Sequence, residues 1–400
     1  MKIMLLFLGL FPFLVFSQTM KPGTWGGEIH YADISVPFTF EVGYPNGEIP
    51  EIVFINGKER RVVKNATVEG DSITIPMDPF DVAIKARFSA MGMSGSYIKY
   101  YRDVKLPFSA SFGKPRFMKK STKISPSQLA SKWSMTLDPE TKNASQGVGL
   151  FNLSNGVVTG TILTGVSDYR FFEGILDGDS IKLSSFDGAH AFMILGKKIG
   201  QKWEGKMIYD INYAEPWIAE PNPNAALPDP FEIVTLEQGV HKPYYDLLSA
   251  GSGKNAINAE EYAGKVLVIQ LFGTWCPNSH DETQYLVKWY AKNKDRDIAI
   301  LASSYEANYS QEYGLKRLDD YKEMNNIPYD LVLGGRLSKT SAAMPFPFMN
   351  KIEAFPTLVI IDKQGYARYV HSYFNGPATG SYYTDFDQRF NDIIDQLLEE

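Results

Sequence analysis

Residues 265–286 read KVLVIQLFGTWCPNSHDETQYL, and this stretch decides the fold of the C-terminal half of the chain. Its first part, residues 266–272, is a nearly continuous apolar run, which predicts a strand buried on both faces. The glycine and the polar residues that follow end this strand. The pattern therefore predicts that Cys276, the only cysteine in the sequence, lies at the tip of a buried strand.

A helix is expected to begin directly after the cysteine. Pro277 suits the first position of a helix, because it has no N–H group to leave unpaired. Asp281 and Glu282 are expected in the first turn, where the helix dipole favours anions. Cys276 would then lie at the helix N-cap, where unpaired N–H groups stabilise a thiolate. The sequence therefore predicts an activated thiol with a lowered pKa.

The motif Trp275-Cys276-Pro277-Asn278-Ser279 resembles the W-C-x-x-C active site of the thioredoxin superfamily, in its TlpA/ResA-like branch, which is related to the redoxins and to AhpC/TSA proteins. Phe355-Pro356-Thr357 resembles the loop with a cis proline that faces the cysteine in that fold. The resemblance covers roughly residues 223–400. It implies an α/β thioredoxin-like domain in which Cys276, Ser279 and Pro356 are the catalytic residues. It also implies that Trp275, Pro277, Phe355 and Thr357 contact the substrate.

One departure from this pattern limits the chemistry. Ser279 stands where the family has its second cysteine, so a disulfide within one chain cannot form. The Ser279 hydroxyl can hydrogen-bond the sulfur but cannot attack a mixed disulfide. The motif W-C-x-x-S is consistent with a monothiol exchanger, and equally with a domain that has lost turnover and kept a binding groove.

His280 is a possible modulator of the thiol. It follows Cys276 by four residues, a spacing that places both side chains on one helix face. A protonated imidazole would lower the thiol pKa, and a neutral one would serve as a base. The alternative is a histidine that is only solvated.

The N-terminus predicts export. Residues 1–17 carry Lys2, a long apolar stretch and a Val-Phe-Ser ending, which is typical of a cleavable signal peptide rather than a membrane anchor. We expect a periplasmic or secreted protein with no membrane span in the mature chain. The net charge of −6 argues against nucleic acid as the main partner. The five histidines have no metal-ligand spacing, so no metal and no cofactor are expected.

The region before the thioredoxin-like domain predicts antiparallel β structure. Val36, Phe38, Phe40 and Val42 alternate with small or polar residues, and Asn-Gly pairs such as 155–156 indicate hairpin turns.

An internal repeat is also predicted in this region. Gly70-Asp71-Ser72-Ile73 recurs as residues 178–181, and Phe80-Asp81 recurs as residues 186–187. Gly95 and Gly205 follow in the same order. The pattern favours two related β sheets over coincidence, and the arrangement resembles the β-rich region that precedes the redox domain in some TlpA-like proteins.

These patterns predict five segments. They are a signal peptide (1–17), a first β domain (18–117), a second β domain (132–215), a proline-rich linker (216–230) and a thioredoxin-like domain (231–400). Within the last, Phe231-Glu232-Ile233-Val234-Thr235-Leu236 predicts an entry strand, and residues 386–398 predict an amphipathic helix.

Three functions follow from the motif. The first is thiol–disulfide exchange by the single nucleophile Cys276, acting on exported proteins with disulfides or oxidised cysteines, with an external thiol as reductant. The second is a one-cysteine peroxiredoxin-like antioxidant, which needs Thr or Ser three residues before the cysteine; Gly273 stands there instead. The third is an inactive thioredoxin-fold binding or adaptor protein.

Overall fold

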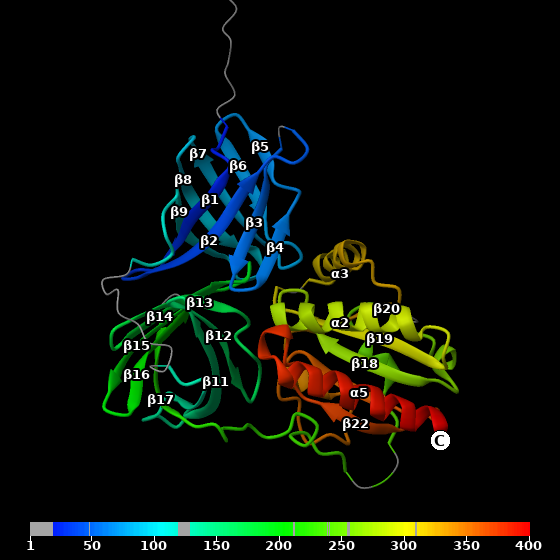
Figure 1. The fold of residues 1–400 in the computed structure, drawn as a ribbon. Coiled ribbons are helices and arrows are strands. Elements are labelled where there is room, and N and C mark those ends of the chain that lie inside the picture. The colour runs from blue at the N-terminus through cyan, green and yellow to red at the C-terminus, as the bar shows by residue number, and fades with distance from the viewer. Residues whose placement is uncertain are drawn as a thin grey trace, which may run out of the picture.

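The computed structural model describes residues 19–47, 49–118, 129–210, 213–237, 239, 241–253, 257–308 and 310–400. The predicted signal peptide, residues 1–17, lies outside the described residues. The described chain forms an open nine-stranded sheet, a closed eight-stranded barrel and a five-stranded sheet with helices. In Figure 1 the nine-stranded sheet stands above the barrel, and the domain with the helices lies beside both.

The nine-stranded sheet is antiparallel throughout, as the alternation of apolar residues predicted. In β2 the side chains of Val36, Phe38, Phe40 and Val42 are buried, which confirms the predicted core face. The strand order is β4-β3-β2-β1-β9-β8-β7-β6-β5. The strands are β1 (Gly23–His30), β2 (Ser35–Gly43), β3 (Glu51–Asn56), β4 (Glu59–Val63), β5 (Thr67–Glu69), β6 (Ser72–Pro76), β7 (Val82–Phe88), β8 (Gly92–Lys99) and β9 (Val104–Phe112).

The barrel closes because its first strand pairs with its last, with Trp133 opposite Pro221. Both residues of the predicted Asn155-Gly156 turn have positive φ, as this tight hairpin requires. Three buried tryptophans, Trp133, Trp203 and Trp217, belong to the barrel core. The strands are β10 (Lys132–Leu137), β11 (Ser145–Ser154), β12 (Val157–Thr164), β13 (Phe172–Asp177), β14 (Ser180–Phe186), β15 (Ala191–Ile199), β16 (Lys202–Asp210) and β17 (Tyr213–Pro221).

The two halves of the predicted repeat have similar local structure. Gly70 and Gly178 both have φ near +60° in the turns that lead into β6 and β14. Gly95 in β8 and Gly205 in β16 both lie so close to the preceding strand that an added Cβ would stand 2.1 and 1.9 Å from one of its carbonyl oxygens. The duplication itself stays a prediction.

The five-stranded sheet has the order β20-β19-β18-β21-β22, with β18, β19 and β20 parallel and β21 and β22 antiparallel to their neighbours. The predicted central strand is confirmed as β18, because every residue from Val266 to Phe272 is buried. Its alternate side chains enter two different cores, one beneath α2, α3 and α5 and one on the opposite face. The elements are α1 (Tyr245–Leu248), β18 (Val266–Phe272), α2 (Pro277–Asn293), β19 (Ile298–Glu306), α3 (Gln311–Asn325), β20 (Asp330–Arg336), α4 (Lys339–Ala343), β21 (Thr357–Ile361), β22 (Ala367–His371) and α5 (Ser381–Glu399).

Two details of this domain differ from the prediction. Residues 231–236 do not form a strand; only Leu236 makes an isolated bridge, to Met349. Asp281 and Glu282 lie in the second turn of α2, because the helix begins at Pro277. The predicted amphipathic helix is confirmed within α5, whose buried face includes Phe390 and Leu397.

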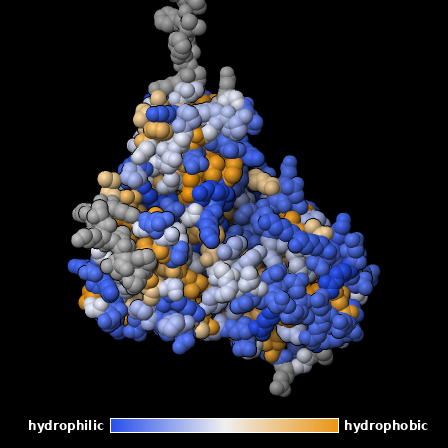
Figure 2. Space-filling model, in the orientation of Figure 1, coloured by the Kyte–Doolittle hydropathy of each residue, from blue (hydrophilic) through white to orange (hydrophobic). Residues whose placement is uncertain are grey.

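The segment boundaries stay predictions, and β17 extends to Pro221, inside the segment 216–230 expected as a linker. No helix within the described residues is long and apolar enough to cross a membrane. In Figure 2 the visible face of the helical domain is mostly hydrophilic, whereas hydrophobic residues are visible on the first sheet and the barrel.

Candidate functional site

Cys276 is the N-cap residue of α2, as the sequence predicts. Its carbonyl accepts the first helical hydrogen bond, from the His280 amide at 3.0 Å. The sulfur lies 3.7 Å from the Phe355 carbonyl oxygen, and the Phe355–Pro356 bond is cis, which confirms the predicted isomer. The loop before β21 thus brings Phe355 and Pro356 beside the thiol, although about 80 residues of sequence separate them.

The prediction of a lowered thiol pKa is wrong. Only 8% of Cys276 is exposed, and this burial raises the pKa of its thiol above the ordinary value. Hydrogen bonding from Ser279 and from the Asn278 amide acts in the opposite direction, and the carboxylate of Asp187 raises the pKa further. The sequence prediction failed because it weighed the helix N-terminus alone, whereas loss of water is the larger effect here.

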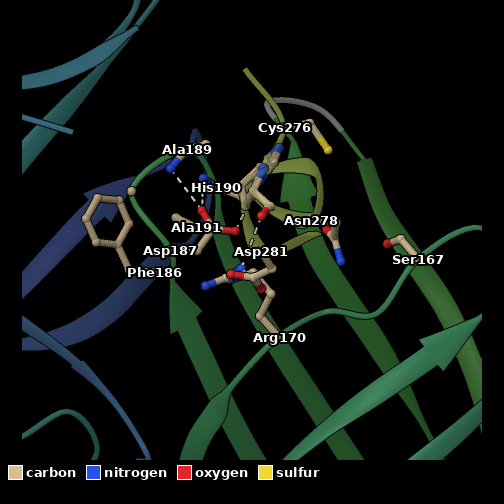
Figure 3. Close-up of polar contacts among 12 residues, drawn as sticks. Ser167, Arg170, Phe186, Asp187, Ala189, His190, Ala191, Cys276, Asn278 and Asp281 are labelled. Atoms are coloured by element: carbon tan, nitrogen blue, oxygen red, sulfur yellow. Dashed lines mark hydrogen bonds and ion pairs between the residues drawn. The ribbon is translucent and has the colours of Figure 1, made fainter. Parts of the chain in front are cut away.

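The thiol nevertheless borders open space. A cavity of about 690 Å³ is lined by Trp275, Cys276, Asn278 and Phe355 of the C-terminal domain together with residues of both β regions. Figure 3 shows Arg170 of the barrel beside Asp281 of α2, with the Cys276 sulfur pointing away from Asp187 and His190. The site is therefore formed jointly by the redox-motif helix and the barrel, which sequence reasoning did not predict.

A loop of the barrel, residues 164–170, holds the start of α2. The Arg170 guanidinium donates to an Asp281 carboxylate oxygen, to the Pro277 carbonyl at 3.3 Å and to Glu59 of β4 at 2.5 Å. Arg170 of the barrel thus contacts both the first β domain and the C-terminal domain. Only 5% of its surface is exposed. Pro277 was predicted to contact the substrate, but its carbonyl already accepts a hydrogen bond from Arg170.

Asp168 forms the second part of this contact. The Asn278 amide group donates to the Asp168 carbonyl at 3.1 Å and to its carboxylate at 3.2 Å. The carboxylate also accepts the backbone N–H groups of Gly376 and Arg170. Burial raises the pKa of Asp168 to about 6 against these hydrogen bonds. Asp168 and Arg170 of the barrel thus cover the N-terminal end of α2.

Trp275 is covered from the other side by the first β domain. Its indole N–H donates to the Tyr305 carbonyl at 3.0 Å, and its ring stacks on Tyr101 with the centroids 6.4 Å apart. Tyr101 belongs to a short 3-10 helix, Tyr100–Arg102, between β8 and β9. The predicted contact surface for a substrate is therefore shared with the protein's own β domain.

The remaining predicted residues are buried. Thr357 is fully buried, and its hydroxyl donates to the Ala354 and Ser372 carbonyls. Ser279 is also fully buried; its Oγ makes no hydrogen bond of normal geometry in the described structure, yet it lies near enough to the thiol to lower the Cys276 pKa.

His280 does not supply a positive charge to the thiol. Its ring packs edge-on against Phe80 and Tyr321, with centroids 5.6 and 6.1 Å apart. Burial holds the pKa of His280 well below its ordinary value, so the imidazole is neutral at neutral pH. The hypothesis of a protonated modulator is therefore wrong.

Two acidic groups near the motif were missed. Glu282 lies on the buried face of α2 and accepts a hydrogen bond from Gln270 at 2.9 Å. Burial raises its pKa to about 8. The spacing of Glu282 to Leu286 and Trp289, at i+4 and i+7, places it on the apolar helix face and was a signal for this burial.

The second acidic residue is Asp187, which pairs with His190 at the rim of the barrel. The carboxylate accepts the His190 amide and lies 3.3 Å from His190 Nδ1. Although burial acts to raise it, the neighbouring His190 and Arg170 hold the pKa of Asp187 at about 2. The sequence marked Asp187 only as part of a repeat, although its hydrogen-bond partners, Ala189 and His190, follow it directly in the chain.

Comparison with known proteins finds similar sequences for the domain that carries Cys276. Residues 241–370 match the AhpC/TSA family. The thiol-disulfide oxidoreductases ResA of Bacillus thuringiensis subsp. konkukian and of Bacillus cereus are each 26% identical to this chain over 115 residues, which is 27% of the chain. The chain spans 56% of the length of these relatives.

Among solved structures, a thioredoxin family thiol:disulfide interchange protein from Chlorobium tepidum is similar, at 18% identity and a TM-score of 0.27. The similarity covers 44% of this chain and 99% of that protein. The buried strand that ends at Phe272, the cysteine at a helix N-cap four residues later and the family match together show that the C-terminal domain is a TlpA/ResA-like domain of the thioredoxin superfamily.

Proposed function

We propose that this protein catalyses thiol–disulfide exchange with Cys276 as its only sulfur nucleophile. The observation that carries the proposal is the position of the sulfur, at the N-cap of α2, 3.7 Å from the Phe355 carbonyl and on the wall of a 690 Å³ cavity. The relatives named thiol-disulfide oxidoreductases support it.

The exchange has two balanced steps. The Cys276 thiolate, having lost its proton to solvent, bonds to one sulfur of a disulfide, and the other sulfur leaves as a thiolate that takes up a proton. Because the 400-residue sequence has no second cysteine, an external thiol must then attack the mixed disulfide and release Cys276.

Export is part of the proposal. The predicted signal peptide, residues 1–17, would deliver the protein to the periplasm or outside the cell, where disulfides persist. The predicted substrates are exported proteins with disulfides or oxidised cysteines. They would have to present a sulfur that reaches the cavity at Cys276.

The test uses the full chain after reduction. A mixed disulfide is added, and the mass of the protein and the release of free thiol are followed with time. We expect an adduct of one equivalent on Cys276 that persists until an external thiol is supplied, and no adduct in Cys276→Ser. Failure of the reduced, folded wild-type chain to form this adduct would overturn the proposal.

Ser279 supplies a second variant. Ser279→Cys places a resolving thiol one turn along the helix, so the adduct should decay without an external thiol and leave a protein two mass units lighter than the dithiol form. Ser279→Ala is the matched control and should keep a persistent adduct. A persistent adduct in Ser279→Cys would contradict the proposed geometry.

The peroxidase alternative is disfavoured at one position. A Cβ added at Gly273 would lie 2.3 Å from the Trp275 indole nitrogen, so no hydroxyl-bearing side chain fits three residues before the cysteine without moving that ring. Consumption of hydrogen peroxide with formation of one sulfenate on each chain would favour this alternative.

The adaptor alternative is favoured by a specific observation, the 8% exposure of Cys276 and its raised thiol pKa. An adaptor would show no reaction of Cys276 with any disulfide in the same assay, while the chain remained folded.

A further inference from the structure

A second, smaller cavity lies between the barrel and the C-terminal domain. Its volume is about 220 Å³, and its walls come from β12, from residues 227–231 after β17, from the end of β22 and from the first half of α5. Figure 1 shows the start of α5 beside the barrel. None of the residues that line this cavity lines the larger cavity at Cys276, so it is a separate space.

Two buried polar side chains on its walls have unpaired atoms. His371, the last residue of β22, is 1% exposed, and Asn375 is 5% exposed. Within the described residues, neither His371 Nδ1 nor Asn375 Oδ1 has a hydrogen-bond partner. Leaving a buried polar atom unpaired costs free energy, which a polar group of a ligand would recover.

The chemistry of these two atoms indicates what that polar group is. The His371 ring is packed between Phe231 and Phe386, with both centroid distances at 4.6 Å. Burial lowers the pKa of His371 to about 3, so the imidazole is neutral at neutral pH. A nitrogen of a neutral imidazole either donates or accepts, whereas an amide oxygen accepts. A hydroxyl group, which both donates and accepts, suits both atoms.

Much of the remaining wall is aromatic, with the side chains of Phe231, Tyr373, Tyr382 and Phe386. An apolar cavity of about 150 Å³ holds benzene. The 220 Å³ here therefore accommodates one aromatic ring with a small substituent.

The charged residues of the wall do not select an ionic ligand. Asp229 and Arg389 both line the cavity, and they pair with each other. The Arg389 guanidinium also lies over the Phe231 ring, 4.5 Å from its centroid. Asp385 is exposed to solvent on α5. A neutral ligand fits this wall best.

We propose that this cavity binds a neutral molecule of one aromatic ring that bears a hydroxyl group. The ring lies among the four aromatic side chains. The hydroxyl donates to Asn375 Oδ1 and has His371 Nδ1 as its second partner. Binding there requires no reaction at Cys276.

The test measures the binding of phenol and of toluene, in which a methyl group replaces the hydroxyl, to the full chain by NMR of the ligand. We expect saturable binding of phenol with a Kd of about 1 mM or tighter. Absence of saturable phenol binding would overturn the proposal. Tighter binding of benzylamine or benzoate than of phenol would assign a charged ligand and would also overturn it.

Asn375→Leu keeps most of the side-chain size and removes the amide. The ratio of phenol affinity to toluene affinity should fall about tenfold in this variant, because the hydroxyl loses its acceptor while the ring contacts remain. The ratio cancels the difference in hydrophobicity between the two ligands. Asn152→Leu, at an exposed position of β11, is the matched control and should keep the wild-type ratio. An unchanged ratio in Asn375→Leu would refute the assigned hydrogen bond.

Leu227→Trp provides a second variant that does not alter the polar wall. Leu227 lines the cavity, and the larger indole should fill it and weaken both ligands at least tenfold. Phenol binding of wild-type strength in folded Leu227→Trp would show that phenol binds elsewhere, and the proposed site would be wrong.

Discussion

The Cys276 sulfur experiences two opposed influences. The N-terminus of α2 and hydrogen bonding from Ser279 and Asn278 favour the thiolate, whereas burial favours the neutral thiol, and burial is the larger effect. A nucleophile of this kind is slow at neutral pH but intrinsically strong once ionised, because the nucleophilicity of a thiolate rises with its pKa.

The first prediction concerns this thiol. The rate of alkylation of Cys276 plotted against pH should have its midpoint above the value of about 8.5 that is usual for cysteine. Ser279→Ala should move the midpoint higher still, because it removes an interaction that lowers the pKa. Ser145→Ala, at an exposed serine of β11, should leave the midpoint unchanged. A midpoint below 8 in the wild type would contradict the prediction.

The second prediction concerns Glu282, whose folded-state pKa of about 8 lies above its ordinary value of 4.5 because of burial. The folded state therefore disfavours the ionised carboxylate. Stability is undiminished below pH 4.5, falls as the pH rises between 4.5 and 8, and is lower by roughly 5 kcal/mol above that window. Glu282→Gln should remove this decline, with the largest gain in the free energy of unfolding above pH 8.

Urea unfolding between pH 5 and pH 9 measures the effect. Glu323→Gln, at an exposed position on α3, is the control and should follow the wild type within about 0.5 kcal/mol. Parallel curves for Glu282→Gln and the wild type would show that the carboxyl is not protonated in the folded protein.

Single residues of the site were predictable where the signal was local. The position of Cys276 before Pro277, and the pairing of the cysteine with a cis Pro356, follow from the motif and are confirmed. The covering of the motif by the β domains was not predictable, because Tyr101, which stacks on Trp275, and Arg170, which donates to the Pro277 carbonyl, lie more than one hundred residues earlier in the sequence.

At the scale of elements, the start of α2 and the loop 164–170 of the barrel form one polar contact. Arg170 is almost completely buried and makes ion pairs with both Glu59 and Asp281. A buried ion pair adds little stability by itself, but removing one partner leaves a buried charge uncompensated. Arg170 therefore fixes the position of the helix that carries the thiol.

The third prediction follows from this contact. Arg170→Met keeps much of the side-chain volume and removes the charge, so it should lower the free energy of unfolding by about 3–5 kcal/mol. Adding Asp281→Asn should restore part of the loss, because the uncompensated carboxylate is then gone. Denaturant unfolding of the two variants gives the measurement.

Arg296→Met is the matched control. It removes a pair with Asp395 whose partners are 37% and 56% exposed, and such surface pairs contribute about 1 kcal/mol or less. Equal losses for Arg170→Met and Arg296→Met would show that the buried contact has no special role.

The predictability of the elements depended on their neighbours. The alternation in β2 and the apolar run of β18 were sufficient, because each strand has a partner on both sides. Residues 231–236 are also rich in apolar residues, but their only strand-like pairing is the isolated bridge from Leu236 to Met349, and so they form no strand. Composition indicates what a segment can form, and the available hydrogen-bonding partners decide whether it does.

At the scale of the whole molecule, contacts far from the thiol keep it enclosed. The Tyr97 hydroxyl of β8 donates to the Ala189 carbonyl of the barrel at 2.6 Å, and the Tyr313 hydroxyl of α3 donates to Asp81 of the first β domain. Arg116 adds a hydrogen bond to the Ser184 carbonyl at 3.0 Å. The three domains thus surround one small volume, and its opening depends on all of their interfaces.

The fourth prediction tests this dependence. Tyr313→Phe removes one hydrogen bond between α3 and the first β domain, worth about 1 kcal/mol. The alkylation rate of Cys276 should rise about fivefold because the open form is more populated, while the midpoint of its pH profile stays in place. Tyr290→Phe, on α2 with its ring against Tyr329, should leave the rate unchanged. An unchanged rate in Tyr313→Phe would mean that reagents reach the sulfur without any separation of the domains.

The relative placement of the three domains could not be predicted from the sequence. The duplicated β patterns and the redox motif each indicate a separate unit, and nothing local marks Asp168 or Asp187 as neighbours of the thiol. Interfaces between units depend on side chains that meet only after each unit has folded, so their residues carry no periodic signal.

The closure of the barrel has a consequence for how such a chain can be assembled. Since β10 pairs with β17, the chain enters and leaves this unit at one side, with Trp133 opposite Pro221. A module with adjacent ends can be spliced into a gene between two older units, or excised from it, and the flanking units keep their separation. The enclosure of a reactive sulfur by a barrel thus needs an insertion upstream and a few matching side chains on the helix that carries the sulfur, such as Asn278 and Asp281.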